Sequence, residues 1–102
     1  ERVVCEFDTD DGPLCLVLVG ALFVGSIETV FAGEINPPPG RGGKVRLIEA
    51  GVGRTFWRGE ELGRFNMGST VIVLTGKAAA FAPRVEPGEP VRLGQMLARF
   101  SA

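Results

Sequence analysis

The chain has 102 residues, a formal net charge of -1 and no histidine. Its length suits a single domain, and its near-neutral charge excludes broad electrostatic binding to nucleic acid or to an anionic membrane. Because histidine is the commonest general base near neutral pH and a common metal ligand, its absence weighs against a self-sufficient hydrolase, and no metal site is predicted.

The chain is expected to consist of short β-strands. Its fifteen glycines and seven prolines leave no window with helical periodicity over three turns. The fold class predicted is all-β or β-rich, a barrel or sandwich of short strands. In chain order the predicted strands are 2–8, 14–22, 26–32, 44–48, 62–66, 70–75, 80–84 and 95–100.

The two cysteines, Cys5 and Cys15, flank the turn sequence DTDDGP, so a hairpin there could bring them near each other. Two cysteines alone carry no zinc or redox signature, and reduced, half-buried core thiols are expected. The uncharged run at 14–27 falls short of the ~20 residues that span a bilayer. Glycines interrupt this run and its valines favour strands, so it is interpreted as two buried strands.

Two segments are predicted to be irregular. Residues 34–43, EINPPPGRGG, form a loop because proline donates no ladder hydrogen bond. Residues 51–63 mix turn residues with Phe56-Trp57, and a helical turn is expected there. Trp57 and its neighbour are interpreted as a core or loop anchor, and Arg58 and Arg64 as solvated side chains.

The C-terminal stretch 85–100, VEPGEPVRLGQMLARF, has turns at its glycines and a short strand predicted from Val91. Its spacing resembles the half-barrel motif of lipoyl and biotinyl domains. This likeness concerns architecture. It predicts a lipoyl-like half-barrel near the C-terminus and leaves the chemistry open.

The segment RFNMGSTVIVL, residues 64–74, places Gly-Ser-Thr at the head of an apolar, β-branched strand. By itself the tripeptide is typical of a turn entering a strand. The flanking sequence indicates a more specific function. The C-terminal part of phosphatidylserine decarboxylase resembles two segments of this chain, RGEELGRFNMGSTVIVL and FDTDDGPLCLVLVGALFVGSIETVFAG. The closing segment VEPGEPVRLGQMLA occurs at the same place in the order of family segments. The resemblance covers nearly the whole chain. Met67 stands where the family usually has leucine, a volume-conserving difference.

The resemblance implies a self-processing site at Gly68-Ser69. The Ser69 hydroxyl would attack the Gly68 carbonyl, and elimination of the resulting ester would leave a pyruvoyl group at position 69, the cofactor of the family. Glycine leaves the attacked carbonyl uncrowded. Thr70 would contact the oxyanion through its hydroxyl or its N–H. Residues 1–68 would then be the β-chain-like part and 69–102 the α-chain-like part of one domain.

The resemblance also implies the substrate and the partners. The reaction would be decarboxylation of phosphatidylserine to phosphatidylethanolamine. The expected partners are a membrane surface reached through parts outside this chain, the protein's own N-terminal part or other processed chain, and a second copy in a homo-oligomer. No nucleic acid is expected. The location implied is a bacterial inner membrane or a mitochondrial inner membrane.

One departure from the family affects the activity expected of this segment. Members activate the serine with a histidine and an aspartate that precede this region, and the chain holds no histidine. General-base catalysis contributes roughly 10²–10⁴-fold to a rate. The 102 residues alone are therefore expected to stay unprocessed or to cleave very slowly.

The residues are also compatible with two other functions. The first is a lipoyl- or biotinyl-like carrier or binding module with no chemistry at Ser69, in which Lys77 would lie at an exposed turn. The second is a pyruvoyl decarboxylase that acts on a soluble amino acid.

Overall fold

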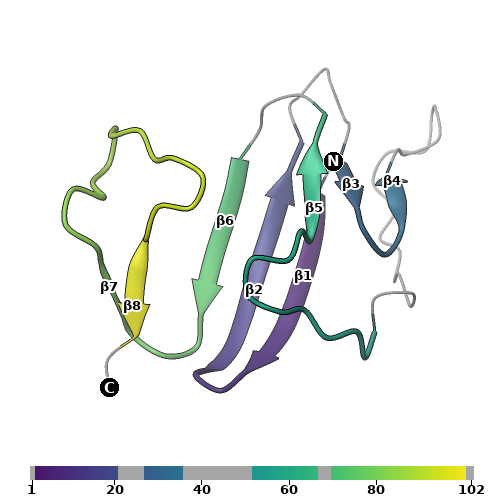
Figure 1. The fold of residues 1–102 in the computed structure, drawn as a ribbon, viewed down its shortest axis with the longest axis horizontal. Helices are drawn as coiled ribbons and strands as arrows, with labels where there is room; N and C mark the ends of the chain where they lie inside the picture. The colour runs from purple at the N-terminus through teal and green to yellow at the C-terminus, as the bar shows by residue number, and fades with distance from the viewer. Residues whose placement is uncertain (1, 21–26, 36–51, 67–69, 101–102) are drawn as a thin grey trace. The chain divides into compact units, whose positions relative to one another are not determined.

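The computed structural model describes residues 2–20, 27–35, 52–66 and 70–100 (Figure 1). Within these ranges the chain forms strands and turns and no helix. This confirms the prediction of an all-β fold. The strands are β1 (Arg2–Thr9), β2 (Gly12–Val19), β3 (Ile27–Thr29), β4 (Gly33–Ile35), β5 (Gly63–Phe65), β6 (Thr70–Thr75), β7 (Ala79–Phe81) and β8 (Ala98–Phe100).

These strands make three small sheets. The first has the order β1-β2-β6, the second β4-β3-β5, and the third pairs β7 with β8. In the second and third sheets neighbouring strands are antiparallel. The sheets are open, and the described strands close no barrel.

The β1–β2 hairpin begins the chain and contains much of its core. Val3 and Cys5 are buried while Val4 between them is 59% exposed, the alternation expected of a strand with one face covered. Leu18 of β2 is buried as well. Both cysteines are free thiols, Cys5 buried and Cys15 half-buried, which confirms the prediction for them.

The second sheet is centred on β3. Ile27 is fully buried and pairs with Ile35 of β4 on one side and with Phe65 of β5 on the other. Thr29, with 2% of its surface exposed, is a buried polar residue. Its hydroxyl oxygen accepts a hydrogen bond from the Ala32 N–H at 3.1 Å, which satisfies that oxygen and closes the turn after β3.

Several predicted boundaries are wrong. The predicted strand 26–32 ends at Thr29, and residues 30–32 form a turn. The strand β4 follows this turn and overlaps the start of the predicted loop 34–43. The helical turn expected within 51–63 is absent from the described residues 52–63. The predicted strand 44–48 lies outside the described residues.

The strands predicted for the C-terminal region are only partly confirmed. The predicted strand 80–84 ends at Phe81, and a turn follows in which Arg84 adopts a φ of 69°. No strand begins at Val91, and the predicted strand 95–100 starts at Ala98. The β7–β8 pair is extended by a hydrogen bond from the Ala82 N–H to the Leu97 carbonyl, 2.8 Å.

The chain divides into two compact units. The first comprises Glu1–Val4 and Val17–Ile72, and the second Cys5–Leu16 and Val73–Ala102. The strands β1, β2 and β6 each contribute residues to both units. The second sheet, with the strand that leads to the Gly-Ser-Thr segment, belongs to the first unit.

Candidate functional site

The predicted cleavage position lies between two strands of different sheets. The strand β5 ends at Phe65 and β6 begins at Thr70. Gly68 and Ser69 themselves lie outside the described residues. The structure thus describes the segments that lead into and out of the predicted site, and the first unit holds residues 63–72.

The strand that approaches the site is packed tightly against β3. Gly63 pairs with Thr29, and a Cβ atom on Gly63 would lie 2.5 Å from the carbonyl oxygen of Glu28. A hydrogen bond from the Val30 N–H to the Leu62 carbonyl, 2.9 Å, continues the contact beyond the ladder. The β5 backbone can approach β3 this closely because Gly63 has no side chain.

Arg64, the central residue of β5, lies between two carboxylates. Its Nε atom is 3.8 Å from Glu28 Oε2 and 3.4 Å from Glu61 Oε1. The Arg64 side chain remains 59% exposed, as predicted, so these ion pairs are screened by solvent. Two acidic side chains thus lie near the Arg64 charge, two residues before Asn66.

The strand that leaves the site is apolar and exposed. Thr70, the residue predicted to contact the oxyanion, is exposed at the start of β6, and all five residues that follow it in the strand are exposed as well. The strand boundaries 70–75 are those predicted. The oxyanion role of Thr70 stays a prediction.

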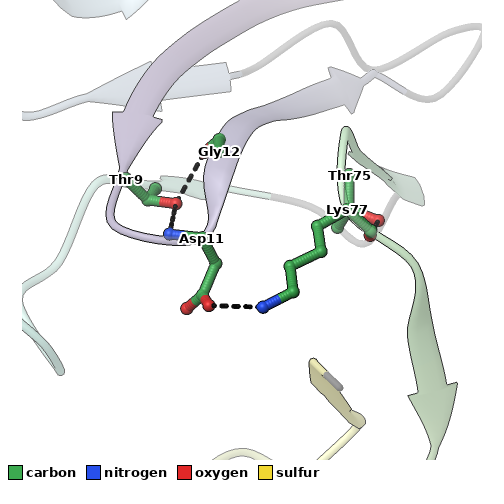
Figure 2. A network of polar contacts seen from close by, with 5 residues as sticks. All are labelled: Thr9, Asp11, Gly12, Thr75 and Lys77. Atoms are coloured by element: carbon green, nitrogen blue, oxygen red, sulfur yellow. Dashed lines mark hydrogen bonds and ion pairs between the residues drawn. The ribbon is translucent and has the colours of Figure 1, made fainter. Parts of the chain in front are cut away.

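A network of polar contacts in the second unit joins the turn of the β1–β2 hairpin to the end of β6 (Figure 2). Lys77 Nζ lies 3.4 Å from Asp11 Oδ1, and the hydroxyl of Thr75 donates to the Lys77 carbonyl at 2.9 Å. The Gly76 N–H donates to the Pro13 carbonyl at 2.9 Å. These contacts link the part before position 69 with the part after it.

The contacts of Lys77 weigh against the alternative that this chain is a lipoyl- or biotinyl-like carrier module. A carrier lysine must reach into solvent from a free turn, whereas Lys77 is half-buried and its ammonium group pairs with Asp11. The hairpin turn that presents Asp11 is itself held by Thr9, whose hydroxyl donates to the Gly12 carbonyl at 2.6 Å and accepts from the Asp11 N–H at 3.1 Å.

The aromatic pair predicted to anchor a core or loop is mostly outside any core. Trp57 is 78% exposed, so the prediction is wrong for it, whereas Phe56 is half-buried and Arg54 lies 4.9 Å above its ring. Glu60 organises this loop, because its carboxylate accepts from the Trp57 N–H at 3.2 Å and pairs with Arg54 at 3.4 Å. Arg58 is exposed, as predicted.

An open pocket of about 520 Å³ lies in the second unit and was not predicted. Its lining includes the acidic Glu6 and Asp8, the thiol of Cys15 and the apolar Leu74. No local sequence pattern identifies it, because its walls come from β1, β2 and the end of β6. Nearby, burial raises the pKa of the Cys5 thiol, and Cys15 adds a smaller effect in the same direction.

Among the residues that the structure describes, no three histidine, cysteine, aspartate or glutamate side chains gather closely enough to hold a metal ion. None of the described segments forms a helix long and apolar enough to cross a membrane.

Comparison with known proteins identifies the family. The profile of the phosphatidylserine decarboxylase family matches residues 1–99, so the chain belongs to this family. A phosphatidylserine decarboxylase proenzyme of Alkalilimnicola ehrlichii is 59% identical over 80 residues, 78% of this chain and 28% of that protein. Proenzymes of the same name from Methylococcus capsulatus and Pseudomonas fluorescens are each 50% identical over 99 residues, 95% of this chain and 34% of theirs.

The chain spans about a third of the length of the curated relatives that it matches. No solved structure matches it. The family match confirms the resemblance drawn from the Gly-Ser-Thr segment and its neighbours.

Proposed function

We propose that this chain is the processing region of a phosphatidylserine decarboxylase, cleaved between Gly68 and Ser69 by its own serine. The observation that carries the proposal is the family match over residues 1–99. That match includes Gly68-Ser69-Thr70, and this tripeptide falls at the junction of β5 and β6. The name of the relatives, proenzyme, supports a precursor that is processed.

The residues at this junction suit an intramolecular acyl shift. Ser69 Oγ attacks the Gly68 carbonyl carbon, and the peptide bond to the Ser69 nitrogen breaks as the ester forms. Elimination then releases the Gly68 carboxylate and leaves a dehydroalanine at position 69. Water converts this residue to a pyruvoyl group and releases ammonia. Thr70 is proposed to stabilise the oxyanion of the first step.

The pairing of the described strands on either side of the junction supports the proposal. The strand β5 is fixed on β3 through the close approach at Gly63, and β6 is fixed on β2 by ladder hydrogen bonds. A strained or unusual backbone at the junction is easiest at glycine.

The pyruvoyl group, once formed, supplies an electrophilic carbonyl that binds the substrate amine and accepts the electrons released with CO₂. Phosphatidylserine is the proposed substrate and phosphatidylethanolamine the product. Decarboxylation of a soluble amino acid is the alternative, and comparison of the lipid with free serine separates the two.

The base that activates Ser69 is proposed to come from the rest of the longer polypeptide, because these 102 residues contain no histidine. Association with a bacterial or mitochondrial inner membrane, through parts outside this chain, belongs to the same proposal. Assembly into a homo-oligomer is also proposed.

The experiment is cleavage of the full-length proenzyme, followed by denaturing gel and by decarboxylation of phosphatidylserine in mixed micelles. Wild-type protein should yield two chains and activity, and Ser69→Ala should yield one chain and none. The variant Ser26→Ala is the control, because it removes a serine outside the proposed junction. Activity in an uncleaved wild-type protein would contradict the proposal.

A further inference from the structure

The strand β6 lies at the end of its sheet, with β2 as its neighbour among the described strands. Its four central residues form the unbroken apolar run Val71 to Leu74. Each of the four is between 44% and 55% exposed. Since side chains alternate between the two faces of a strand, both faces of β6 are about half exposed.

This composition is that of an interior strand. A continuous apolar run is typical of strands buried on both faces, and edge strands of soluble proteins are usually protected by charges or proline. The opposite edge of the same sheet shows such protection, since β1 carries Arg2, Glu6 and Asp8. The strand β6, TVIVLT, contains no charged residue and no proline.

One hydrogen bond shows which N–H groups of β6 point away from β2. The Gly76 N–H points to β2, because it donates to the Pro13 carbonyl. Successive N–H groups of a strand point in opposite directions. The N–H groups of Ile72 and Leu74 therefore face β2, and those of Val71, Val73 and Thr75 face the free edge, where they can receive another strand.

The length of the relatives indicates how much further polypeptide is available to this edge. About two thirds of each relative lies outside the region matched by this chain. A second copy that paired β6 with β6 would complete the edge, yet it would leave both apolar faces of the strand about half exposed. A larger body of polypeptide can supply a strand for the edge and side chains for the faces.

We propose that the free edge of β6 is a docking site for an extended strand of the same polypeptide, from the part of the full-length decarboxylase outside residues 1–102. The added strand pairs with the N–H groups of Val71, Val73 and Thr75. Because β6 begins directly after Ser69, this pairing also fixes the peptide on the C-terminal side of the cleavage position. That last consequence rests on the proposed function.

Photocrosslinking of the full-length proenzyme tests the docking. A benzoylphenylalanine replaces Leu74 in a Ser69→Ala background, so that the result does not depend on cleavage. After irradiation in the presence of phosphatidylcholine vesicles, the crosslinked peptides are identified by mass spectrometry. Attachment to a peptide outside residues 1–102 of the same molecule is expected. The matched control places the probe at Arg58, an exposed turn residue, and should give no such product.

Hydrogen exchange of the same proenzyme without the probe covers the case in which the probe disturbs folding. Slow exchange is expected at the amides of both Val73 and Leu74, because each N–H has a strand partner. Fast exchange at Val73 beside slow exchange at Leu74 would show a free edge and overturn the proposal. Crosslinks to residues 1–102, to a second copy or to lipid would overturn it too. Failure of wild-type protein to cleave would count against the proposed function and leave the crosslink result valid.

Discussion

Gly63 and Gly76 lie so close to other parts of the chain that a side chain has no room. A Cβ atom would lie 2.5 Å from the Glu28 carbonyl oxygen at Gly63, and 2.6 Å from Pro13 Cγ at Gly76. Neither residue has a positive φ, so steric contact, and not backbone conformation, requires glycine at both. This differs from Gly88, which has a φ of 86° and open space around it.

The variant Gly63→Ala should lower the free energy of unfolding by about 1–3 kcal/mol, the usual cost of forcing atoms into a packed site. It should also slow cleavage, because β5 leads to the cleavage position. Urea unfolding of the full-length Ser69→Ala protein, with and without Gly63→Ala, measures the first effect. The comparison variant Gly88→Asn should cost less, since a side chain there meets open space and asparagine is among the few residues that adopt a positive φ. Equal stability of the Gly63→Ala protein would contradict the close packing of β5 on β3.

The raised pKa of the Cys5 thiol predicts how stability depends on pH. As pH rises, the unfolded chain ionises its thiol first, near the ordinary value of about 8.5. The folded chain then holds more protons than the unfolded one. The contribution of Cys5 to stability is therefore complete below this pH and is lost as pH rises through the folded-state pKa. Unfolding at pH 7 and pH 9.5 should show a larger loss for wild-type protein than for Cys5→Ala. An equal loss in both would exclude burial of this thiol.

At the scale of elements, the turn of the β1–β2 hairpin makes contacts of unequal strength: one ion pair to Lys77 after β6, and two hydrogen bonds within the turn itself. The Lys77–Asp11 pair is 40% and 45% exposed, and ion pairs at such positions contribute about 0.2–1 kcal/mol. The two hydrogen bonds of the Thr9 side chain are expected to contribute about 0.5–1.5 kcal/mol each.

The variant Lys77→Gln should therefore lower stability by less than about 1 kcal/mol, and the difference should vanish in 1 M salt, roughly where the screening length falls to ~3 Å. Thr9→Val should cost more, and its cost should persist in salt. Thermal or urea unfolding of the full-length protein at low and high salt separates the two. A large, salt-independent loss for Lys77→Gln would show that Lys77 has a role beyond this ion pair.

The accuracy of the strand predictions depended on how each strand ends. The strand β6 was predicted at its observed bounds because glycine-containing segments flank an unbroken β-branched run. The turn after β3 was missed because Val30 and Phe31 favour strands. Its causes are the bond to the Thr29 side chain and the positive φ of Gly33, 67°. Strand propensity does not register a local turn that depends on a hydrogen bond to a side chain.

The candidate site was predicted by resemblance and not by local pattern. Gly68-Ser69-Thr70 is an ordinary sequence at the start of a strand. It was interpreted as a processing site only because the flanking segments occur in the same order as in the family. The close approach at Gly63 and the ion pairs of Arg64 could not be predicted, because both depend on the pairing of β5 with β3. The exposure of Trp57 was missed because a lone aromatic pair is more often buried.

At the scale of the whole molecule, these residues form two small units with few fully buried side chains. The described core includes Val3, Cys5, Leu18, Ile27 and Thr29. Much of the apolar surface of β6 to β8 remains exposed, Leu93 and Phe81 included. The chain spans about a third of its relatives, and our proposal places the missing general base in the rest of such a longer polypeptide.

Cleavage should accordingly depend on the rest of the polypeptide. The full-length proenzyme is expected to cleave, and the 102-residue segment expressed alone is expected to stay intact, because general-base assistance of roughly 10²–10⁴-fold is missing. Denaturing gels over time compare the two. Addition of a separately expressed remainder should restore cleavage if the pieces associate. Rapid cleavage of the isolated segment would contradict the need for an outside base.

The intact mass of the denatured full-length protein is the most direct measurement of the chemistry at Ser69. Two chains are predicted: one that ends at Gly68, and one that begins at position 69 and is lighter than its serine form by the mass of one ammonia. Ser69→Ala should give a single mass for the whole chain. A single unprocessed mass in active wild-type protein, or cleavage that leaves an intact serine at position 69, would contradict self-processing to a pyruvoyl group.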